Sequence, residues 1–189
     1  MLGFEDECWW SRLTEPDTHA WRPEDQPLCL RDKQGQVPKG EPKALACYGV
    51  WLPAAGERGR MLLRFVQGRP ESAVTEPFLE WVSQELYAAG KQALLLVWDN
   101  ASWHGSARIR AWLRQHNRQV KRGEKEGVRL ICCFLPTKSP WLNPIEPKWL
   151  HGKRAVAEPD RALGQGELRE RVHAYYDCSQ HPLLSKVIG

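Results

Sequence analysis

The pattern of apolar and polar positions along this chain predicts a mixed β-sheet with helices. Continuous or alternating apolar residues predict strands at 2–10, 44–52, 61–67, 94–99 and 128–135. Helical spacing of apolar residues predicts helices at 72–89, 106–118, 144–157 and 167–176. The first three strands would form an antiparallel meander, whereas the later strands alternate with helices, as in an α/β fold. Residues 11–40 are predicted to form a long polar excursion with short extended pieces around 20–22 and 28–30.

The stretch 94–146 holds the strongest candidates for chemistry. Its apolar start, 94–98, stops at Asp99-Asn100, which is typical of a buried parallel strand covered on both faces. Functional residues of open α/β sheets lie beyond the carboxyl ends of such strands, where Asp99 falls. Asn143-Pro144 predicts the start of a helix with Glu146 as its third residue. A carboxylate after a central strand and another in a first helical turn suit a metal ion bound between them.

Each of these residues also has a simpler interpretation. Glu146 could belong to a capping box with Asn143, and Asp99-Asn100 could form an ordinary turn at the end of a strand. His104 is either a histidine of a surface loop or a group near a bound phosphate. Taken one at a time, these residues do not define an active site.

The first strand packs acidic residues between apolar ones, and a buried carboxylate is costly unless it is paired or bound to a cation. Strand alternation places Asp6 on the same face as Phe4 and Cys8. Glu5 and Glu7 fall on the other face, where they would be solvated. Asp6 is therefore the acidic residue of this strand that calls for a functional explanation.

Composition and charge narrow the class of protein without deciding it. The 189 residues have a formal net charge of +4, which permits a polyanionic partner but does not require one. No apolar run approaches the roughly 20 residues of a membrane span, and the first residues lack a basic segment typical of a signal peptide. The six cysteines form no Cys-x-x-Cys pair, which disfavours a zinc site and favours reduced thiols in the cytosol.

Three segments carry a resemblance to a known family: Phe4-Glu5-Asp6-Glu7, Val97-Trp98-Asp99-Asn100-Ala101-Ser102-Trp103-His104, and Ser139-Pro140-Trp141-Leu142-Asn143-Pro144-Ile145-Glu146-Pro147-Lys148-Trp149. Together they resemble the signature blocks of the mariner superfamily of transposases, and most of all its bacterial insertion-sequence branch, often called DDE-superfamily endonucleases. The resemblance extends from residue 2 to about residue 154. The second and third blocks are specific in combination, whereas the Asp-Glu of the first would be weak alone.

The resemblance implies a ribonuclease H-like fold, with a mixed five-stranded sheet and helices on both faces. It also implies that Asp6, Asp99 and Glu146 are catalytic and together bind two Mg²⁺ ions, which Mn²⁺ could replace. Glu7, Asn100, His104 and Asn143 would lie near the site. Residues 1–157 would form the catalytic domain and 158–189 a helical extension of it.

Relatives carry an N-terminal helix-turn-helix domain, whereas this chain starts at the first catalytic strand. Asp99 and Glu146 are separated by 46 residues, more than is usual in the family, and the excess is predicted to be a loop at 119–127.

The predicted partner is double-stranded DNA, at both transposon ends and target. Residues predicted to contact it are Arg108, Arg110, Arg114, Arg118, Lys138, Lys148, Lys153 and Arg154. Arg110, Arg114 and Arg118 would form a basic ridge on one helix, although such charge runs are usually just solvated. Trp103 and Trp141 could stack on bases or pack in the core.

The resemblance predicts a DNA transposase that cleaves and joins strands. The alternatives are a non-catalytic remnant that binds DNA or a partner protein, and a ribonuclease H-like nuclease for structured nucleic acid. A homodimer and a separate polypeptide carrying the helix-turn-helix domain are further partners to consider, and no membrane is involved. The expected location is the bacterial cytoplasm, at the nucleoid.

Overall fold

The computed structural model describes residues 1–13, 24, 37–54, 57–156 and 161–186. The elements follow one another as β1 (Leu2–Ser11), β2 (Ala44–Ala54), β3 (Glu57–Phe65), α1 (Ser72–Ala88), β4 (Ala93–Trp98), α2 (Ala107–Arg122), β5 (Arg129–Phe134), the 3-10 helix η1 (Pro140–Leu142), α3 (Glu146–Val156) and α4 (Gln165–Tyr176). The predicted strands and helices are confirmed in kind and in order. The extended pieces predicted around 20–22 and 28–30 lie outside the described residues.

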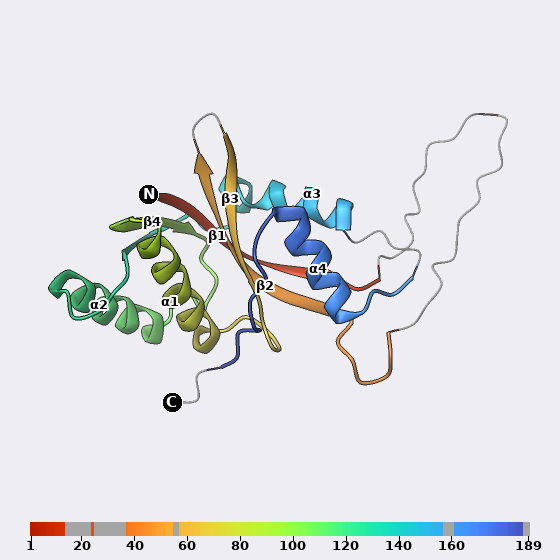
Figure 1. Ribbon diagram of the computed structural model, residues 1–189, viewed down its shortest axis with the longest axis horizontal. Helices are drawn as coiled ribbons and strands as arrows, with labels where there is room; N and C mark the ends of the chain where they lie inside the picture. Colours follow the sequence, from red (N-terminus) through yellow and green to blue (C-terminus); the bar gives the residue numbers. More distant parts are fainter. Residues whose placement is uncertain (14–23, 25–36, 55–56, 157–160, 187–189) are drawn as a thin grey trace.

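The strands form one mixed sheet in the order β3-β2-β1-β4-β5. β1, β2 and β3 pair antiparallel, and β4 pairs parallel with both β1 and β5. The first strand in the sequence therefore lies in the middle of the sheet, with a neighbour on each side (Figure 1). This arrangement puts the carboxyl ends of β1, β4 and β5 at one edge.

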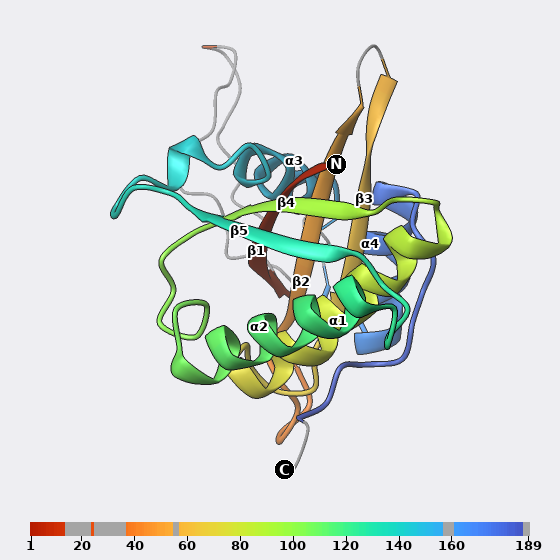
Figure 2. The same ribbon diagram turned by 90° about the vertical axis from the view of Figure 1, so that its left-hand side faces the viewer.

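Strand alternation builds a separate core on each face of the sheet (Figure 2). On one face, α1 and Ile109 of α2 pack against alternate residues of β2, β4 and β5. On the other face, α3 and α4 pack against the opposite residues of β1, β2 and β3. The predicted α/β fold with helices on both faces is confirmed.

The prediction that β4 is covered on both faces is wrong. Leu94 and Leu96 are fully buried on the side of α1 and α2, but Leu95 on the other side is 42% exposed. Ile131 of β5 is likewise 50% exposed. The reason is that α3 and α4 cover β1, β2 and β3 on that face and leave β4 and β5 open.

The segment after α2 also differs from the prediction. The first part of the expected loop at 119–127 is helix, because α2 continues to Arg122 and ends where Gly123 adopts a left-handed backbone with φ 71°. The hairpin between β2 and β3 is tighter than expected, since Ala54 already pairs with Glu57. At the start of α3, Glu146 is the first helical residue rather than the third.

Within the described part of the chain, no helix has the length and apolar character needed to cross a membrane. Five of the six cysteines lie in that part, and all five are free thiols.

Candidate active site

Asp6, Asp99 and Glu146 come from three elements that meet at the carboxyl edge of the sheet. In the parallel pairing of β1 with β4, Phe4 lies opposite Val97, so the same register extended by two residues puts Asp6 beside Asp99. Residues 4, 6, 97 and 99 all point to the face on which α3 packs. Glu146 is the first residue of α3 and approaches the other two acids from that face.

The charges of these acids affect the pKa values of Asp6 and Glu146. Burial, together with the negative charges of Glu146, Glu7 and Asp99, raises the pKa of Asp6 to about 8. Burial also raises the pKa of Glu146, where Asp99 adds to the effect and Lys153 opposes it. The structure thus brings the three predicted catalytic residues into one acidic cluster, near enough for their charges to interact, although their donor atoms do not all lie within 4.8 Å of one another.

Trp149 links the strand that carries Asp6 to the helix that carries Glu146. Its indole Nε1–H donates a hydrogen bond of 3.0 Å to Asp6 Oδ2. The ring is buried and lies over Gly49, which is the cross-strand partner of Asp6 in β2. A Cβ at Gly49 would lie 2.4 Å from Trp149 Cη2, so only glycine leaves room for the ring here. Sequence reasoning included Trp149 in a motif but gave it no role.

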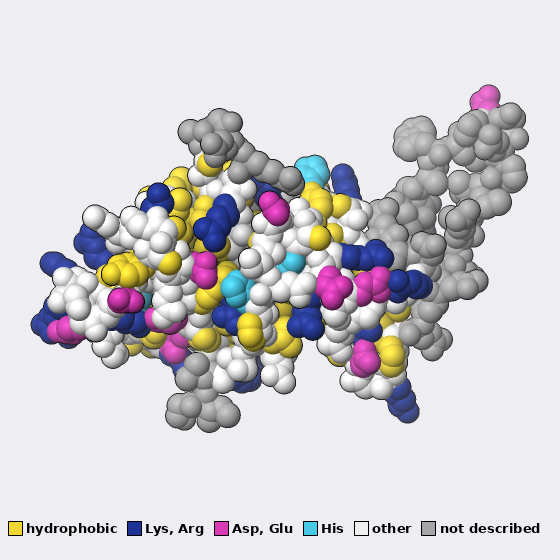
Figure 3. Space-filling model, in the orientation of Figure 1, with side chains coloured by type: hydrophobic (Ala, Val, Ile, Leu, Met, Phe, Trp, Pro, Cys, Tyr) yellow, Lys and Arg dark blue, Asp and Glu magenta, His cyan; other side chains and the backbone are white. Residues whose placement is uncertain are grey.

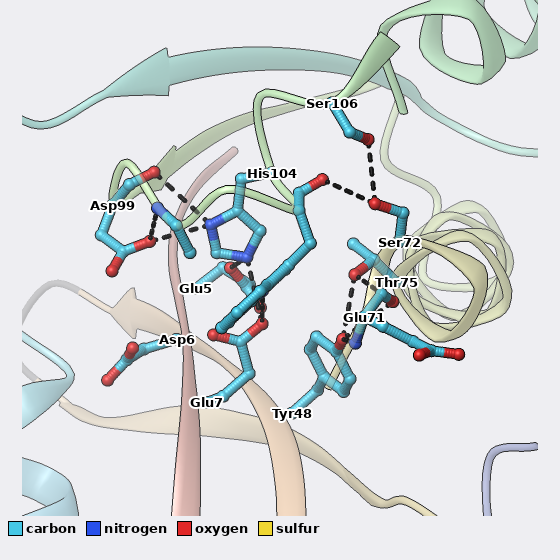
Figure 4. A network of polar contacts seen from close by, with 12 residues as sticks. Glu5, Asp6, Glu7, Tyr48, Glu71, Ser72, Thr75, Asp99, His104 and Ser106 are labelled. Carbon is cyan, nitrogen blue, oxygen red and sulfur yellow. Dashed lines mark hydrogen bonds and ion pairs between the residues drawn. The ribbon is translucent and has the colours of Figure 1, made fainter. Parts of the chain in front are cut away.

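Asp99 is held on its other side by His104, which is buried (Figure 4). His104 Nδ1 lies 2.9 Å from Asp99 Oδ1, and its ring stacks on Trp98 with centroids 4.5 Å apart. Burial alone would lower the pKa of His104, but Glu5, Asp99 and Glu7 outweigh it and raise this pKa to about 11. In return, the hydrogen bond from His104 lowers the pKa of Asp99. His104 is therefore a buried partner of Asp99 and not a surface-loop histidine.

The expectation that Glu5 and Glu7 are solvated is wrong. Glu5 is fully buried, and the Glu7 side chain is only 8% exposed. Both point into the α1/α2 side of the sheet, where His104 Nε2 lies 3.1 Å from Glu7 Oε1 and 3.3 Å from Glu5 Oε2. Because β1 is a central strand with both faces covered near this end, alternation of acidic residues does not identify a solvated face. That central position was not visible in the strand's own sequence.

The two predicted near-site asparagines act as structural ties. Asn143 is buried, and its Nδ2–H donates a hydrogen bond of 2.9 Å to the backbone carbonyl of Glu5, which fixes the loop before α3 to β1. Asn100 Nδ2–H donates to the backbone carbonyl of Leu135 and so joins the ends of β4 and β5. Both contacts stabilise the edge of the sheet at which the acids meet.

A groove of about 670 Å³ opens beside this edge. Its described lining consists of Asp6, Glu7, Trp9, Arg69, Pro70, Glu71, Ser72, Asp99, Ser102 and Trp103, and Glu146 is not part of it. Trp103 donates from Nε1 to Glu7 Oε1 over 2.7 Å, whereas Trp141 is 73% exposed and so is not a core residue. Arg69 brings a positive charge to the groove that sequence reasoning missed, because no pattern connects the segment before α1 with the acids.

The residues predicted to bind DNA form two groups on opposite faces of the sheet rather than one patch. Arg108, Arg110, Arg114 and Arg118 lie on α2, where Lys and Arg side chains gather at one end of the molecule (Figure 3). Lys148, Lys153 and Arg154 lie on α3, and Lys138 precedes η1 with a left-handed backbone.

Several of these basic residues already have partners within the chain. Arg108 forms an ion pair with Glu76 at 2.7 Å, and Lys148 lies 4.8 Å from the centre of the Trp51 ring. Arg114 and Arg118 are exposed beside a hollow of about 400 Å³ on α2. Arg110, the third member of the predicted ridge, is exposed as well but donates a hydrogen bond to the backbone carbonyl of Gly105.

The donor set of the acidic cluster fits Mg²⁺ or Mn²⁺. Asp6, Asp99 and Glu146 offer only carboxylate oxygens, which are the hard ligands these ions prefer. Burial and the neighbouring negative charges raise the pKa of Asp6, and a divalent cation bound there would favour its ionised form.

The fold identifies the structural class of this chain. Three solved structures of Mos1 transposase match it with TM-scores of 0.65, 0.61 and 0.66 and sequence identities of 16%, 16% and 14%: its paired-end complex with the left transposon end, its strand transfer complex and its paired-end complex with Mn. The matches cover 94% of this chain in each case and 48%, 47% and 48% of the transposase chains, so this chain spans about half their length. The fold is thus the ribonuclease H-like fold of these transposases.

The family follows from the sequence. The family model of the DDE superfamily endonucleases matches residues 11–169, a range that includes Asp99 and Glu146 and begins after Asp6. The chain belongs to the DDE endonuclease superfamily. A search of curated protein sequences gives no match.

Proposed function

We propose that this chain is the catalytic domain of a DDE transposase, which cleaves DNA strands at transposon ends and transfers them to target DNA. The observation that carries the proposal is the convergence of Asp6, Asp99 and Glu146 on one end of the sheet, where burial and neighbouring negative charges raise the pKa values of Asp6 and Glu146. Membership of the DDE endonuclease superfamily supports it. The strand transfer and paired-end complexes of Mos1 transposase, which has the same fold, support a DNA substrate.

In this proposal Asp6, Asp99 and Glu146 bind two Mg²⁺ ions, which Mn²⁺ can replace. Such ions make a water or a 3′-hydroxyl nucleophilic near neutral pH and stabilise the leaving oxyanion. The chain's own residues hold the ligands in place. His104 fixes Asp99, Trp149 fixes Asp6, and the loop before Glu146 is tied to β1 through Asn143.

DNA would lie along the groove beside Asp6 and Asp99, with Arg69 in contact with a phosphate. Arg114 and Arg118 on α2 would extend the contact with the phosphate backbone. Recognition of transposon ends would come from a helix-turn-helix region, on the same or a separate polypeptide, and a dimer would pair two ends. The place of action would be the bacterial nucleoid.

A plasmid-nicking assay tests the proposal. Supercoiled plasmid and labelled duplexes are incubated with the chain and Mg²⁺ or Mn²⁺, and nicked and joined products are separated by electrophoresis. We expect Asp99→Asn and Glu146→Gln to lower the nicking rate by roughly 10³-fold or more, a loss of about 4 kcal/mol of transition-state stabilisation. Asp177→Asn, at a left-handed position in the cap of α4, is the matched control and should nick at the unaltered rate.

Each result discriminates between the functional classes. Binding of duplex DNA without nicks under any metal condition would favour a non-catalytic remnant. Cleavage confined to branched or hybrid substrates would favour a structure-specific nuclease. Nicking by Asp99→Asn at the rate of the unaltered chain would contradict the assignment of Asp6, Asp99 and Glu146 as catalytic residues.

A further inference from the structure

A second cluster of possible metal ligands lies on the other side of β1 from Asp6. Glu5 and Glu7 are two residues apart on the strand and so share a face, and His104 comes to them from the segment between β4 and α2. One donor atom from each of the three residues lies within 4.8 Å of the other two. Figure 4 shows Glu5, Glu7 and His104 converging on one side of β1 and Asp6 pointing to the other.

Glu5 points into this cluster without a hydrogen-bond donor. The residue is fully buried, and neither of its carboxylate oxygens has a hydrogen-bond partner among the described residues. His104 Nε2 can carry one hydrogen, and it lies closer to Glu7 Oε1 (3.1 Å) than to Glu5 Oε2 (3.3 Å). Glu7 also accepts from Trp103, so the available donors serve Glu7 and leave Glu5 unsatisfied. A buried ionised carboxylate in this state is strongly unfavourable unless a cation binds it.

The charges of this cluster match a divalent ion. A dication bound by both carboxylates and a neutral imidazole leaves no net charge away from water. Nδ1–H of His104 would still donate to Asp99 Oδ1 at 2.9 Å, and metal-bound histidines regularly donate their other N–H to a carboxylate.

The distances also suit a small transition-metal ion. Zinc bonds of about 2.0–2.2 Å in a tetrahedron separate neighbouring ligand atoms by about 3.3–3.5 Å. His104 Nε2 lies 3.1 Å from Glu7 Oε1 and 3.3 Å from Glu5 Oε2, close to these values. Glu7 and Trp103 line the groove, so a water could reach the fourth position.

We propose that Glu5, Glu7 and His104 form a second metal site, separate from the acidic cluster of Asp6, Asp99 and Glu146, which binds a transition-metal ion such as Zn²⁺. The imidazole nitrogen favours Zn²⁺ over Mg²⁺, which prefers oxygen ligands only. The ion would lock β1 to the segment that carries His104 and would orient Asp99 through His104.

The test measures Zn²⁺ binding in a chain that lacks the proposed catalytic ligands. Asp6→Asn/Glu146→Gln removes two of those three ligands and leaves the second site intact. Titration calorimetry should find one Zn²⁺ per chain in this double variant, with a rise in Tm on saturation. X-ray absorption should show one nitrogen among oxygen ligands. Because the readout is metal binding, the result is independent of nuclease activity.

Adding Glu5→Gln to the double variant keeps the shape of the side chain and removes its charge. The affinity for Zn²⁺ should fall by at least about 100-fold, since a ligand is lost. Glu71→Gln is the matched control, because Glu71 lines the same groove outside the cluster, and it should leave the affinity unaltered. If circular dichroism shows that Glu5→Gln does not fold, Glu7→Gln takes its place.

Two outcomes would overturn the proposal. One is no Zn²⁺ binding by the folded double variant in the micromolar range. The other is binding that survives both Glu5→Gln and Glu7→Gln, which would place the ion elsewhere. Either result would leave His104 as an ion-pair partner of Glu5, Glu7 and Asp99.

Discussion

Replacing Gly49 with alanine should disturb the acidic cluster without altering any carboxylate. The new Cβ would lie 2.4 Å from Cη2 and 2.6 Å from Cζ2 of Trp149, where ordinary contacts begin at 3.4 Å. The ring must therefore move by about 1 Å, since interiors are close-packed and offer little slack. Trp149 donates to Asp6 and lies one turn after Glu146 on α3, so the shift reaches both acids.

The magnitudes follow from this displacement. Overpacking of this kind destabilises by about 1–3 kcal/mol, which corresponds to a fall in Tm of about 2–12 °C for a domain of this size. A misplacement of about 1 Å in a catalytic site can slow the reaction by about 100-fold. We expect Gly49→Ala to show both effects, in thermal unfolding followed by circular dichroism and in the plasmid-nicking assay with Mn²⁺.

Two further variants separate the causes. Gly166→Ala in α4 introduces a Cβ that meets nothing within 4 Å and should keep the Tm and the nicking rate. Gly49→Ala/Trp149→Phe removes the clashing ring atoms, so the Tm should recover in part. Nicking should stay slow, because phenylalanine cannot donate to Asp6. A folded Gly49→Ala variant with unaltered Tm and unaltered nicking would refute the view that Trp149 sets the position of these acids.

Two other predictions concern stability and DNA binding. Glu80 contacts Lys125 at 2.5 Å and His116 at 3.6 Å. Burial alone would raise the pKa of Glu80, but these contacts outweigh it and lower the pKa to about 2. The ionised Glu80 side chain therefore stabilises the folded state fully above its unfolded pKa, and this stabilisation is lost as the pH falls through about 2. Glu80→Gln should therefore lower the free energy of unfolding by about 1–2 kcal/mol at pH 7, as measured by urea unfolding. The difference between the variant and the unaltered chain should shrink below about pH 4.5, and a constant difference down to about pH 2 would contradict this. If α2 binds the phosphate backbone, Arg114→Ala/Arg118→Ala should weaken duplex binding and lower the slope of log K against log salt by about 2 in fluorescence anisotropy, and an unchanged slope would exclude these arginines from the contact.

The sequence predicted the elements well because most of them have one buried face. Phe78, Leu79, Val82 and Leu86 recur at helical spacing because α1 presents one side to the sheet, and that spacing located the helix. Gly90, just past the end of α1, has a left-handed backbone with φ 72°, as is typical of a glycine that follows the end of a helix. The motif blocks located Asp6, Asp99 and Glu146, which the structure brings together.

What sequence reasoning missed depends on the neighbours of each strand. Glu5 looked solvated because alternation within β1 says nothing about what packs on each face, and here His104 arrives from a segment about 100 residues away. Leu95 looked buried because an apolar run does not reveal that α3 and α4 cover only part of the sheet. Arg69 lines the groove because of the path that the chain takes before α1, and no sequence pattern predicts that path.

The parallel pairing of β4 with β5 has a consequence for how such sites vary in evolution. Trp98 pairs with Phe134 at the end that carries Asp99, whereas Ala93 pairs with Arg129 at the opposite end, next to the turn that follows α2. Extra turns of α2 therefore lengthen the connection at the end remote from the carboxylates. The 46 residues between Asp99 and Glu146 can grow or shrink there while the acids stay in place, so the length of this spacer is a poor guide to whether a related chain is active.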